Sequence, residues 1–368
     1  MKKLAVILFG SILSLALLFG CNNSDSLIST EGEEQSMDDP DFSGLEKSAG
    51  ECRHIVVANR NAGTISVIEV KTDQVSGTYN LPAGAKTPEP MYVVWAPRLH
   101  RVFVGDRANN QIVVFRDRDF SVETTVPAGA GIWHMWADPG EHQLWVANDI
   151  DKTASVINPA SLQVLATVPM PADLVALGGK PHDVILGPKG GFAYVSLLGV
   201  SGSSDYVVKF DTHTFQEVGR AAVGKDPHLS LTQRNELLYV PCQNGNAVFV
   251  LNRQTMQQVT TISIPGAHGA GMPLHGRTFY TTNFSGGGTN GLFAINTRAN
   301  GIIGSTNTPF PVPHNIALTP NGRKLYLTHS GATAKQVTVY SVAAPDAVPV
   351  YVTTIEVGLN PFGLVFTR

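Results

Sequence analysis

Cysteine is scarce in this chain of 368 residues, which contains Cys21, Cys52 and Cys242 and no others. No two of them form a C-x-x-C pair, which excludes a dithiol redox motif, and the lack of C-x-x-C-H excludes a covalently attached c-type haem. An exported chain could join Cys52 to Cys242, but the two residues belong to distant parts of the sequence. We therefore expect no disulfide between them.

Several catalytic motifs are absent as well. The sequence has no G-x-S-x-G nucleophile elbow, no H-E-x-x-H, no P-loop and no G-x-G-x-x-G unit. The segment GVSG at 199–202 has the composition of a flexible loop, and SGGG at 285–288 lacks the lysine and helix that a phosphate cradle needs. The common serine hydrolase, zinc protease and nucleotide-binding classes are therefore not supported.

Charged residues are also few, at 15% of the chain, and they are unevenly distributed. Residues 1–51 hold 9 acidic and 3 basic side chains, so the rest of the chain holds 20 acidic and 23 basic ones and is almost neutral. A protein that binds nucleic acid needs a dense basic face. We therefore expect no nucleic-acid partner.

No long stretch has the 3.6-residue period of an amphipathic helix. Short runs rich in Val, Ile, Thr and Tyr recur instead, separated by Gly, Pro and Asn clusters, and they group into units of forty-odd residues. This period predicts four-stranded propeller blades. Seven runs fit the second strand of a blade, and they begin near Ile55, Val102, Leu144, Ala193, Leu238, Phe279 and Leu325.

The two ends of this repeat region complement each other. The region starts on a second strand, HIVVANR, and the chain ends on an inner strand, FGLVFTR. Pairing them would leave no unpaired edge in the first blade. We therefore expect residues 53–368 to form one all-β domain, a seven-bladed β-propeller closed by the C-terminal strand.

The blades resemble the YVTN repeat family, whose units have a V-Y-V-T-N strand followed by G-T-V-S-V-I-D. The matching segments are IVVAN at 55–59 with GTISVI at 63–68, LWVAN at 144–148 and FYTTN at 279–283. Sugar lactonases share this blade type. The resemblance implies the fold, and the function depends on the site residues because this fold carries unrelated activities.

Histidine recurs at one point of the repeat, just before the apolar run that opens a new unit. The histidines at this point are His134, His182, His228, His268 and His314, and two other units have Met91 and Phe362 there. Inner strands of a propeller all run in one direction along its axis, so we expect these side chains to converge. A ring of imidazoles with a thioether suits copper, with zinc as the alternative.

The second strand of each unit should end beside this ring. Cys242 and His329 end two such strands and are further candidate metal ligands, while Asp106, Asn148 and Asn283 could accept hydrogen bonds from ligand imidazoles. A histidine ring on a propeller axis resembles nitrous oxide reductase, whose propeller holds a copper cluster. Met91 and Phe362 depart from an all-histidine ring, which favours one or two ions over a cluster.

The N-terminus predicts export. Two lysines follow Met1, and an apolar run then leads to Gly20 and Cys21, as in a secretory signal. The segment LLFGC at 17–21 resembles a bacterial lipobox, which implies that residues 1–21 are a lipoprotein signal and that Cys21 is acylated. Residues 22–52 are polar and acidic, which predicts a disordered tether. Because Asn22 rather than Asp follows Cys21, we expect an outer-membrane location, facing the periplasm or the cell surface.

Together these features predict a lipid-anchored protein of the cell envelope that handles a metal or carries out redox chemistry, with an envelope protein or a redox partner. Any enzymatic activity would be that of a metal-dependent oxidoreductase. One alternative is a scaffold without catalysis, whose loops bind a protein or a glycan and whose histidines only bond backbone carbonyls.

A second alternative is a lactonase-type hydrolase, which would need a carboxylate, a histidine and an arginine together. Asp183, Asp226 and Arg220 are the nearest candidates for the charged groups. Two features of the channel mouth are also expected. Leu174, Val175 and Leu177 would form an apolar lid over it, and Trp133 would form part of the pocket wall.

Overall fold

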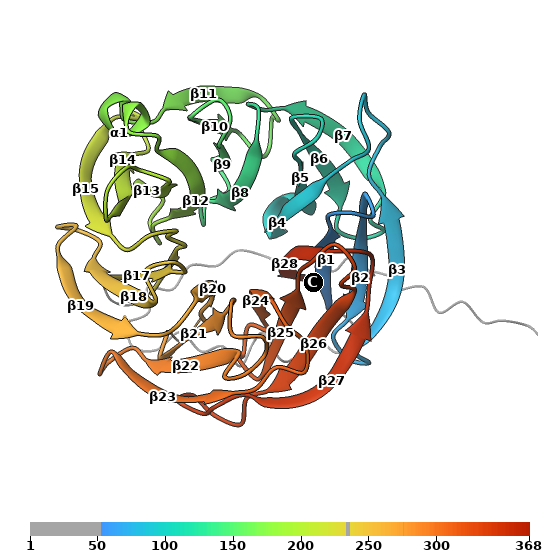
Figure 1. Ribbon diagram of the computed structural model, residues 1–368. Coiled ribbons are helices and arrows are strands. Elements are labelled where there is room, and N and C mark those ends of the chain that lie inside the picture. Colours follow the sequence, from blue (N-terminus) through green and yellow to red (C-terminus); the bar gives the residue numbers. More distant parts are fainter. Residues whose placement is uncertain (1–52, 233–235, 275) are drawn as a thin grey trace, which may run out of the picture. The chain divides into compact units, whose positions relative to one another are not determined.

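The computed structural model describes residues 53–232, 236–274 and 276–368. Within these residues the strands form seven four-stranded antiparallel sheets arranged as a ring (Figure 1). The predicted all-β, seven-bladed propeller is therefore confirmed. The expected signal peptide, the acidic tether, Cys21 and Cys52 lie outside the described residues.

Each sheet is one blade, whose strands follow one another from the axis outward. The first blade has β28 (Pro361–Thr367), β1 (His54–Asn59), β2 (Thr64–Glu69) and β3 (Gln74–Asn80). The second has β4 (Pro90–Ala96), β5 (Arg101–Asp106), β6 (Gln111–Arg116) and β7 (Val122–Pro127). The third has β8 (Ile132–Ala137), β9 (Leu144–Asn148), β10 (Thr153–Ile157) and β11 (Val164–Pro169).

The remaining four blades repeat this layout. The fourth has β12 (Lys180–Leu186), β13 (Phe192–Leu198), β14 (Asp205–Asp211) and β15 (Glu217–Val223). The fifth has β16 (Ser230–Leu231), β17 (Leu237–Cys242), β18 (Ala247–Asn252) and β19 (Gln258–Ser263). The sixth has β20 (Ala267–Gly271), β21 (Thr278–Asn283), β22 (Leu292–Asn296) and β23 (Gly301–Thr306). The seventh has β24 (Pro313–Leu318), β25 (Lys324–His329), β26 (Gln336–Ser341) and β27 (Val350–Glu356).

The described helices are short: the 3-10 helix η2 (Pro97–Leu99) and the helix α1 (Ala172–Ala176). Among the described residues, no helix has the length and apolar character needed to span a membrane.

The C-terminal strand closes the ring as predicted. β28 pairs antiparallel with β1, and Thr367 lies opposite His54. Residues Arg53–Arg368 therefore form one compact unit that contains every strand of the seven sheets. Because the inner edge of the first blade is paired through this contact, the closure removes an edge that would otherwise template aggregation.

The apolar core is divided into layers between neighbouring blades. One such layer packs Trp145 and Val156 of the third blade against Val184 and Val195 of the fourth, all of them buried. Second and third strands are thus covered on both faces, which explains their nearly continuous apolar sequences. Outer strands such as β3 alternate between exposed and half-buried residues because only one of their faces packs.

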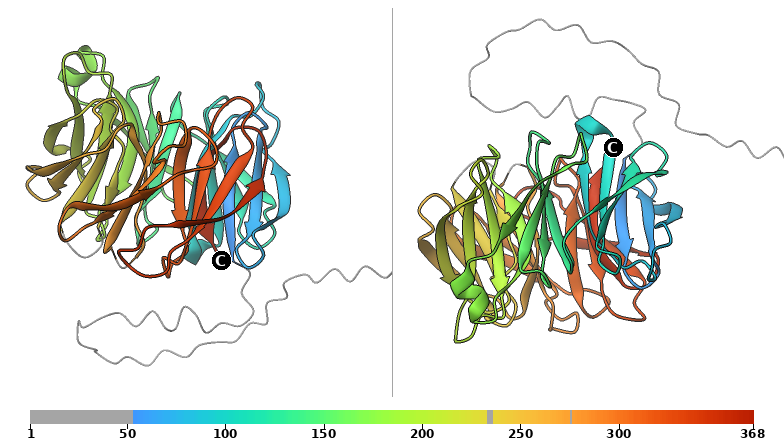
Figure 2. Two further views of the ribbon diagram at one scale, coloured as in Figure 1. Left: turned by 60° about the horizontal axis from the view of Figure 1, so that its bottom comes forward. Right: turned by 90° about the horizontal axis from the view of Figure 1, so that it is seen from above.

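The strands run through the thickness of the ring, as the side views in Figure 2 show. We call the face where the inner strands begin, with Pro90, Ile132 and Pro313, the histidine face. We call the face where they end the opposite face, which also holds the C-terminus at Arg368. Helix α1 projects from the histidine face (Figure 2).

Candidate functional site

A β-bulge near the histidine face shapes the start of six inner strands. In β8, Trp133 and His134 together oppose the single residue Ala147, because the register shifts between Ile132 and Met135. The same shift occurs in β4, β12, β20, β24 and β28. Bulges bend a strand and re-aim its side chains, so this device places two residues per blade next to the axis.

The bulge also fixes which residues of the blades are equivalent. Its first position holds Met91, Trp133, His182, His268, His314 and Phe362, and His228 takes the matching place in the fifth blade, after Pro227. Its second position holds Tyr92, His134, Asp183, Gly269, Asn315 and Gly363. The expected alignment of His134 with the other four histidines was therefore wrong by one residue, and Trp133 takes the equivalent place.

The five histidines nevertheless lie together at the axis, as expected. Ring centroids are 4.7 Å apart between His182 and His228, 3.8 Å between His228 and His268, and 4.8 Å between His268 and His314. His134 joins from the second bulge position, 5.3 Å from His182 and 5.7 Å from His228. All five are buried, with 2% to 9% of their surface exposed.

Aromatic side chains complete the circle. The ring centroid of Phe362 lies 4.2 Å from that of His314 and 5.7 Å from that of Trp133. The Trp133 centroid in turn lies 5.2 Å from that of His182. Tyr92 stacks on His134 with a centroid distance of 3.5 Å. The histidines thus occupy one arc of the ring, and apolar rings occupy the other.

Three of the histidines are close enough to share a metal ion. His134, His182 and His228 each offer a ligand atom, and these atoms lie within 4.8 Å of one another. His134 Nδ1 is 2.8 Å from Asp183 Oδ1. Because Nδ1 donates to this carboxylate, Nε2 is the ring nitrogen left for an ion, and it is buried without a hydrogen-bond partner.

Asp183 is itself held rigidly. Its Oδ1 accepts the backbone N–H of Val184 at 2.7 Å, and its Oδ2 accepts that of Leu229 at 2.8 Å. A carboxylate that orients a histidine in this way is the usual support of a metal-binding imidazole. Asp183 directly follows His182 in the same bulge, so it borders two of the three histidines.

Other ring nitrogens at the axis are also unpaired. His228 Nε2 and both ring nitrogens of His268 are buried without a hydrogen-bond partner. Asp226 Oδ1 lies 3.8 Å from His228 Nε2, which is beyond hydrogen-bond distance. Buried polar atoms are nearly always paired, so the unpaired Nε2 atoms of His134 and His228 fit a bound ion.

His182 is the exception, because its Nε2 accepts a hydrogen bond of 3.1 Å from the indole N–H of Trp133. A neutral imidazole has a single nitrogen lone pair. An ion bound at Nε2 would therefore have to displace the Trp133 donor. Trp133, expected only as a pocket wall, is thus tied directly to one of the candidate ligands.

The environment keeps four of the axial imidazoles neutral. Burial lowers the pKa of His182, His268 and His314 well below the usual 6.5, and it lowers the pKa of His228 to about 3. Neighbouring imidazoles lower these pKa values further, because a positive charge on one ring disfavours charge on the next. The neutral form is the one that binds metals.

The remaining expected ligands have other surroundings. Met91 is fully buried in an apolar cluster with Tyr92 and Phe362. Cys242 is a free, buried cysteine whose thiol donates to the carbonyl of Val240 at 3.4 Å, and burial raises its pKa. Cys242 does not belong to the group whose ligand atoms lie within metal reach of one another.

His329 is bound within its own blade. Its Nδ1 lies 3.0 Å from the carbonyl of Pro311, and its Nε2 lies 2.9 Å from Thr338 Oγ1. With both ring nitrogens engaged, His329 is not brought to the axial group.

The prediction that Asp106, Asn148 and Asn283 accept hydrogen bonds from the axial imidazoles was also wrong. Asp106 accepts the backbone N–H of Glu89, and Asn148 donates to Thr153 and Ser155. Asn283 donates to the carbonyl of Thr289, at 3.5 Å. These side chains fasten turns in their own blades. Asp183 supplies the support instead, and its place next to His182 in the sequence was the available signal.

The lactonase-type candidates separate in space. Asp183 lies in the site and Asp226 borders it, but Arg220 pairs with Asp173 and Glu217 at the outer strand β15. Two arginines missed in the sequence lie closer to the ring. The guanidinium groups of Arg60 and Arg107 are 5.5 Å and 4.8 Å from the centroid of Trp133.

Each of these arginines already has a carboxylate partner. Arg60 pairs with Glu89, and Arg107 pairs with Asp149 at 3.0 Å. The mouth of the channel therefore has two cation–carboxylate pairs above the aromatic arc.

The expected apolar lid does not cover the channel. Leu174 is buried in α1 and packs on Met170 and Val200 within the layer between the third and fourth blades. Leu177 is 48% exposed. Figure 1 shows α1 at the outer rim of the ring, near β11 and β15, so the lid prediction was wrong.

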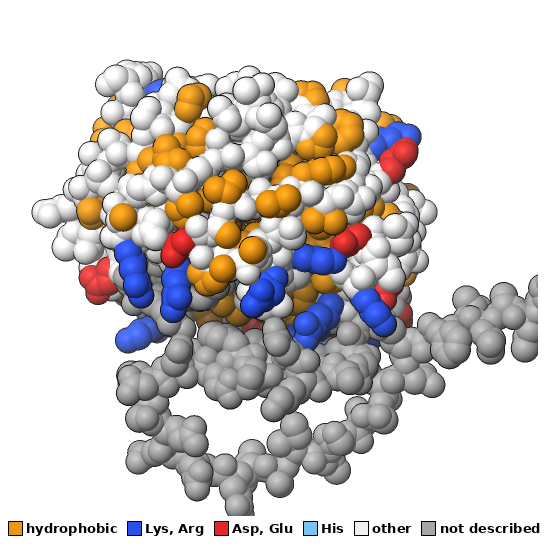
Figure 3. All heavy atoms as spheres, turned by 90° about the horizontal axis from the view of Figure 1, so that it is seen from below, with side chains coloured by type: hydrophobic (Ala, Val, Ile, Leu, Met, Phe, Trp, Pro, Cys, Tyr) orange, Lys and Arg blue, Asp and Glu red, His pale blue; other side chains and the backbone are white. Residues whose placement is uncertain are grey.

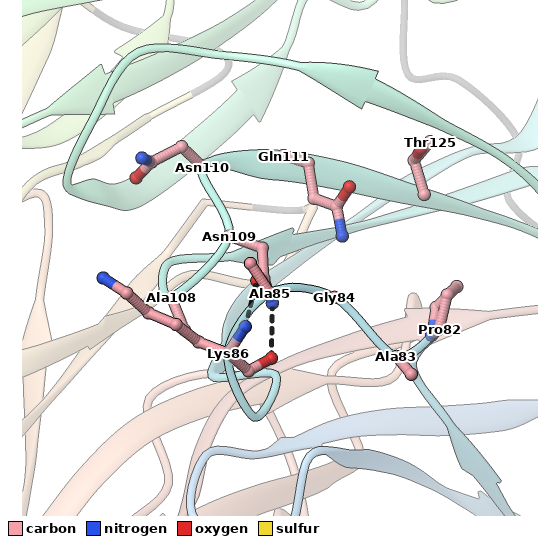
Figure 4. A pocket seen from close by; sticks show the side chains of 10 residues that line it. All are labelled: Pro82, Ala83, Gly84, Ala85, Lys86, Ala108, Asn109, Asn110, Gln111 and Thr125. Atoms are coloured by element: carbon pink, nitrogen blue, oxygen red, sulfur yellow. Dashed lines mark hydrogen bonds between the residues drawn. The ribbon is translucent and has the colours of Figure 1, made fainter.

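A separate cavity of about 440 Å³ lies between the loops that follow β3 and β5 (Figure 4). Asn109 bonds both the backbone N–H and the carbonyl of Lys86 across it, at 3.0 and 3.1 Å. The side-chain amide of Asn109 holds one loop to the other, so the residues that line this cavity have a structural role rather than a catalytic one.

Fold and site together define a seven-bladed propeller with a buried histidine group on its axis. A family model described as "Lactonase, 7-bladed beta-propeller" matches residues 34–264. The chain therefore belongs to this lactonase family of seven-bladed propellers, which confirms the resemblance to lactonase-like propellers. No curated protein matches its sequence.

Solved structures with the same fold come from several bacteria. A periplasmic gluconolactonase of Pseudomonas aeruginosa is 16% identical with a TM-score of 0.67, and the match covers 86% of this chain and 99% of that one. Hydrazine synthase of Kuenenia stuttgartiensis is 16% identical with a TM-score of 0.61, covering 77% and 91%. A functionally unknown protein of Desulfotomaculum acetoxidans DSM 771 is 13% identical with a TM-score of 0.63, covering 84% and 99%. At these identities the likeness concerns the fold alone.

Proposed function

We propose that this propeller binds a transition-metal ion through His134, His182 and His228. The observation that carries the proposal is the group of three buried imidazoles whose ligand atoms lie within 4.8 Å of one another. His134 Nε2 and His228 Nε2 lack hydrogen-bond partners, and a metal ion would provide them. His268 and His314 continue the arc and could accept a second ion or a metal-bound ligand.

Copper is the favoured ion, with zinc as the alternative, because the candidate ligands are all imidazoles. When bound, copper would supply one-electron redox chemistry, and zinc would supply a Lewis acid. The chain's own residues would set the geometry: Asp183 orients His134, and burial keeps His182 and His228 neutral. The corresponding role is metal handling or redox chemistry in the cell envelope, with Cys21 as the lipid anchor.

Hydrolysis of a lactone is the second candidate function, and family membership favours it. The Asp183–His134 pair resembles a carboxylate-supported general base, and the guanidinium groups of Arg60 and Arg107 lie at the mouth of the same channel. In such a hydrolase His134 Nε2 would take a proton from water. The same residues can serve both functions, so the metal requirement distinguishes them.

Titration of the metal-free protein with Cu(I) and Zn(II) against competing chelators tests the proposal. We expect stoichiometric binding that disappears when His134, His182 and His228 are all replaced by Gln. The control variant replaces His100, His142 and His213, three exposed histidines of the opposite face, and should bind like the wild type. Binding too weak to compete, or equal binding by both variants, would refute the site.

Hydrolysis of a sugar lactone by the metal-free protein, abolished in His134→Gln, would establish the second function. A scaffold without catalysis would show neither metal binding nor hydrolysis.

A further inference from the structure

The opposite face of the ring is strongly basic, although the described chain as a whole is nearly neutral. Among the described residues, its turns and chain end expose nine basic side chains: Lys71, Arg98, Arg116, Arg118, Lys189, Arg277, Arg298, Arg323 and Arg368. The same face exposes three acidic side chains: Asp119, Glu236 and Asp346. Figure 3 shows Lys and Arg side chains in a row along the lower edge of the ring.

Other acidic residues of this face are turned inward or already paired. Asp73 accepts Lys324 Nζ at 2.8 Å, and Asp117 is buried and bonds the indole of Trp95. Asp138 is buried and accepts backbone N–H groups of its own turn. These carboxylates therefore contribute to the stability of the turns, while the exposed cations reach the surface.

The histidine face has a different charge pattern. Its exposed basic side chains are Lys86 and Lys180, and its exposed acidic ones are Asp151, Asp173 and Glu356. Arg60, Arg107 and Lys225 each pair with a carboxylate there. Among the described residues, the excess of exposed basic side chains thus lies on one side of the ring, away from the candidate metal centre.

The path of the chain suggests which partner the opposite face binds. Arg53 precedes β1, whose first residue His54 pairs with Thr367 at the end of β28. The chain that precedes Arg53, which includes the expected lipid anchor Cys21, therefore connects to the propeller at the opposite face. Clustered lysines and arginines near an anchor are attracted to anionic lipid headgroups, by about fivefold in affinity for each charge near the surface.

We propose that the opposite face docks on an anionic phospholipid surface and keeps the histidine face pointing away from the membrane. This orientation would leave the channel mouth open to solutes or to a protein partner. The inference does not depend on metal binding.

Vesicle sedimentation tests the proposal with the chain from Asn22 onward, which contains every strand of the ring but not Cys21. We expect it to bind vesicles containing phosphatidylglycerol, to release them at high salt, and not to bind pure phosphatidylcholine. The triple variant Arg98→Glu, Arg118→Glu and Arg298→Glu should lose at least about a hundredfold in affinity, because three favourable charges become repulsive.

The control reverses the two exposed lysines of the histidine face, with Lys86→Glu and Lys180→Glu, and should bind like the wild type. Failure to bind anionic vesicles, or equal losses per reversed charge in the two variants, would overturn the proposal. Binding to duplex DNA without binding to vesicles would assign the face to a nucleic acid and would also overturn it.

Discussion

At the scale of single residues, Asp183 engages one ring nitrogen of His134 and so determines which nitrogen is left for an ion. The carboxylate accepts Nδ1–H at 2.8 Å and leaves Nε2 with its lone pair. The same carboxylate is fixed by two backbone N–H groups, so it cannot turn away without losing both bonds. Orientation of this kind reduces the cost of ordering a ligand when an ion binds.

Replacing Asp183 by Asn should weaken metal binding by about 10- to 100-fold, because the charge that stabilises the Nδ1–H tautomer is lost. Chelator competition at neutral pH measures this change. Asp226→Asn is the matched control, since Asp226 borders His228 without a hydrogen bond, and it should have a much smaller effect. Equal affinities for wild type and Asp183→Asn would show that the carboxylate does not position a ligand.

Trp133 opposes metal binding, because its indole N–H donates a hydrogen bond to the lone pair of His182 Nε2. Trp133→Phe keeps an aromatic ring but removes the donor, so an ion no longer has to break a hydrogen bond worth about 1 kcal/mol. We expect about fivefold tighter metal binding, measured by the same competition. Trp136→Phe changes an exposed indole of the same strand and should leave the affinity unchanged. Weaker binding by Trp133→Phe would mean that the indole supports the site.

At the scale of elements, the bulge of the inner strands determines the composition of the axis. Its second position holds a large side chain in some blades and glycine at Gly269 and Gly363. A Cβ at Gly363 would lie 2.6 Å from the carbonyl of Met91 and 2.6 Å from Tyr92 Cα. Neighbouring inner strands therefore approach too closely there for any side chain, and both contacts are with backbone atoms that cannot move independently.

Gly363→Ala should destabilise the propeller by about 2 kcal/mol or more, because the added methyl group overpacks the closing blade. Urea unfolding monitored by fluorescence measures the change. Gly191→Ala is the control: nothing lies within 4 Å of a Cβ added there, so stability should stay within about 0.5 kcal/mol of the wild type. A Gly363→Ala protein as stable as the control would contradict the close packing of the first and second blades.

The bulge also explains where sequence reasoning about the site failed. Spacing identified the five histidines, because a repeated unit carries its residue types from blade to blade. Spacing could not distinguish the two bulge positions, since Trp133 and His134 are adjacent and either fits a period in the forties. The role of Asp183 was missed for a related reason: its partner lies 49 residues earlier in the chain, and the packing of the third blade against the fourth brings them together.

At the scale of the whole molecule, the buried imidazoles link stability to pH. Their folded-state pKa values are lowered, so below about pH 6.5 the unfolded chain binds more protons than the folded one. The free energy of unfolding must then fall as the pH drops from about 6.5 toward the folded-state values. The slope is about 1.4 kcal/mol per pH unit for each such histidine.

The metal-free protein should therefore lose stability steeply between about pH 6.5 and about pH 4.5, as measured by urea unfolding. Replacing His228, whose folded-state pKa is about 3, by Phe should flatten this dependence. His213→Phe changes an exposed ring on the opposite face and should leave the slope unchanged. Identical slopes for His228→Phe and the wild type would contradict a neutral, buried His228.

The ring itself was predictable because each unit repeats the same strand pattern and the two chain ends complement each other. The predicted starts of the second strands differ from the observed ones by at most one residue. The first was predicted at Ile55 and begins at His54, and the third begins at Leu144 as predicted. The charge asymmetry of the two faces was not predicted. Net charge sums over the chain, and the near-neutral total conceals a face whose exposed charged side chains are mostly basic.

Elemental analysis of the natively exported, untagged protein is the most direct test of the metal site. We predict near-stoichiometric copper or zinc in the wild type and in the variant with Gln at His100, His142 and His213, and its loss in the variant with Gln at His134, His182 and His228. Absence of metal from the wild type, even after incubation with copper and zinc, would contradict the account. So would full retention of metal by the axial variant.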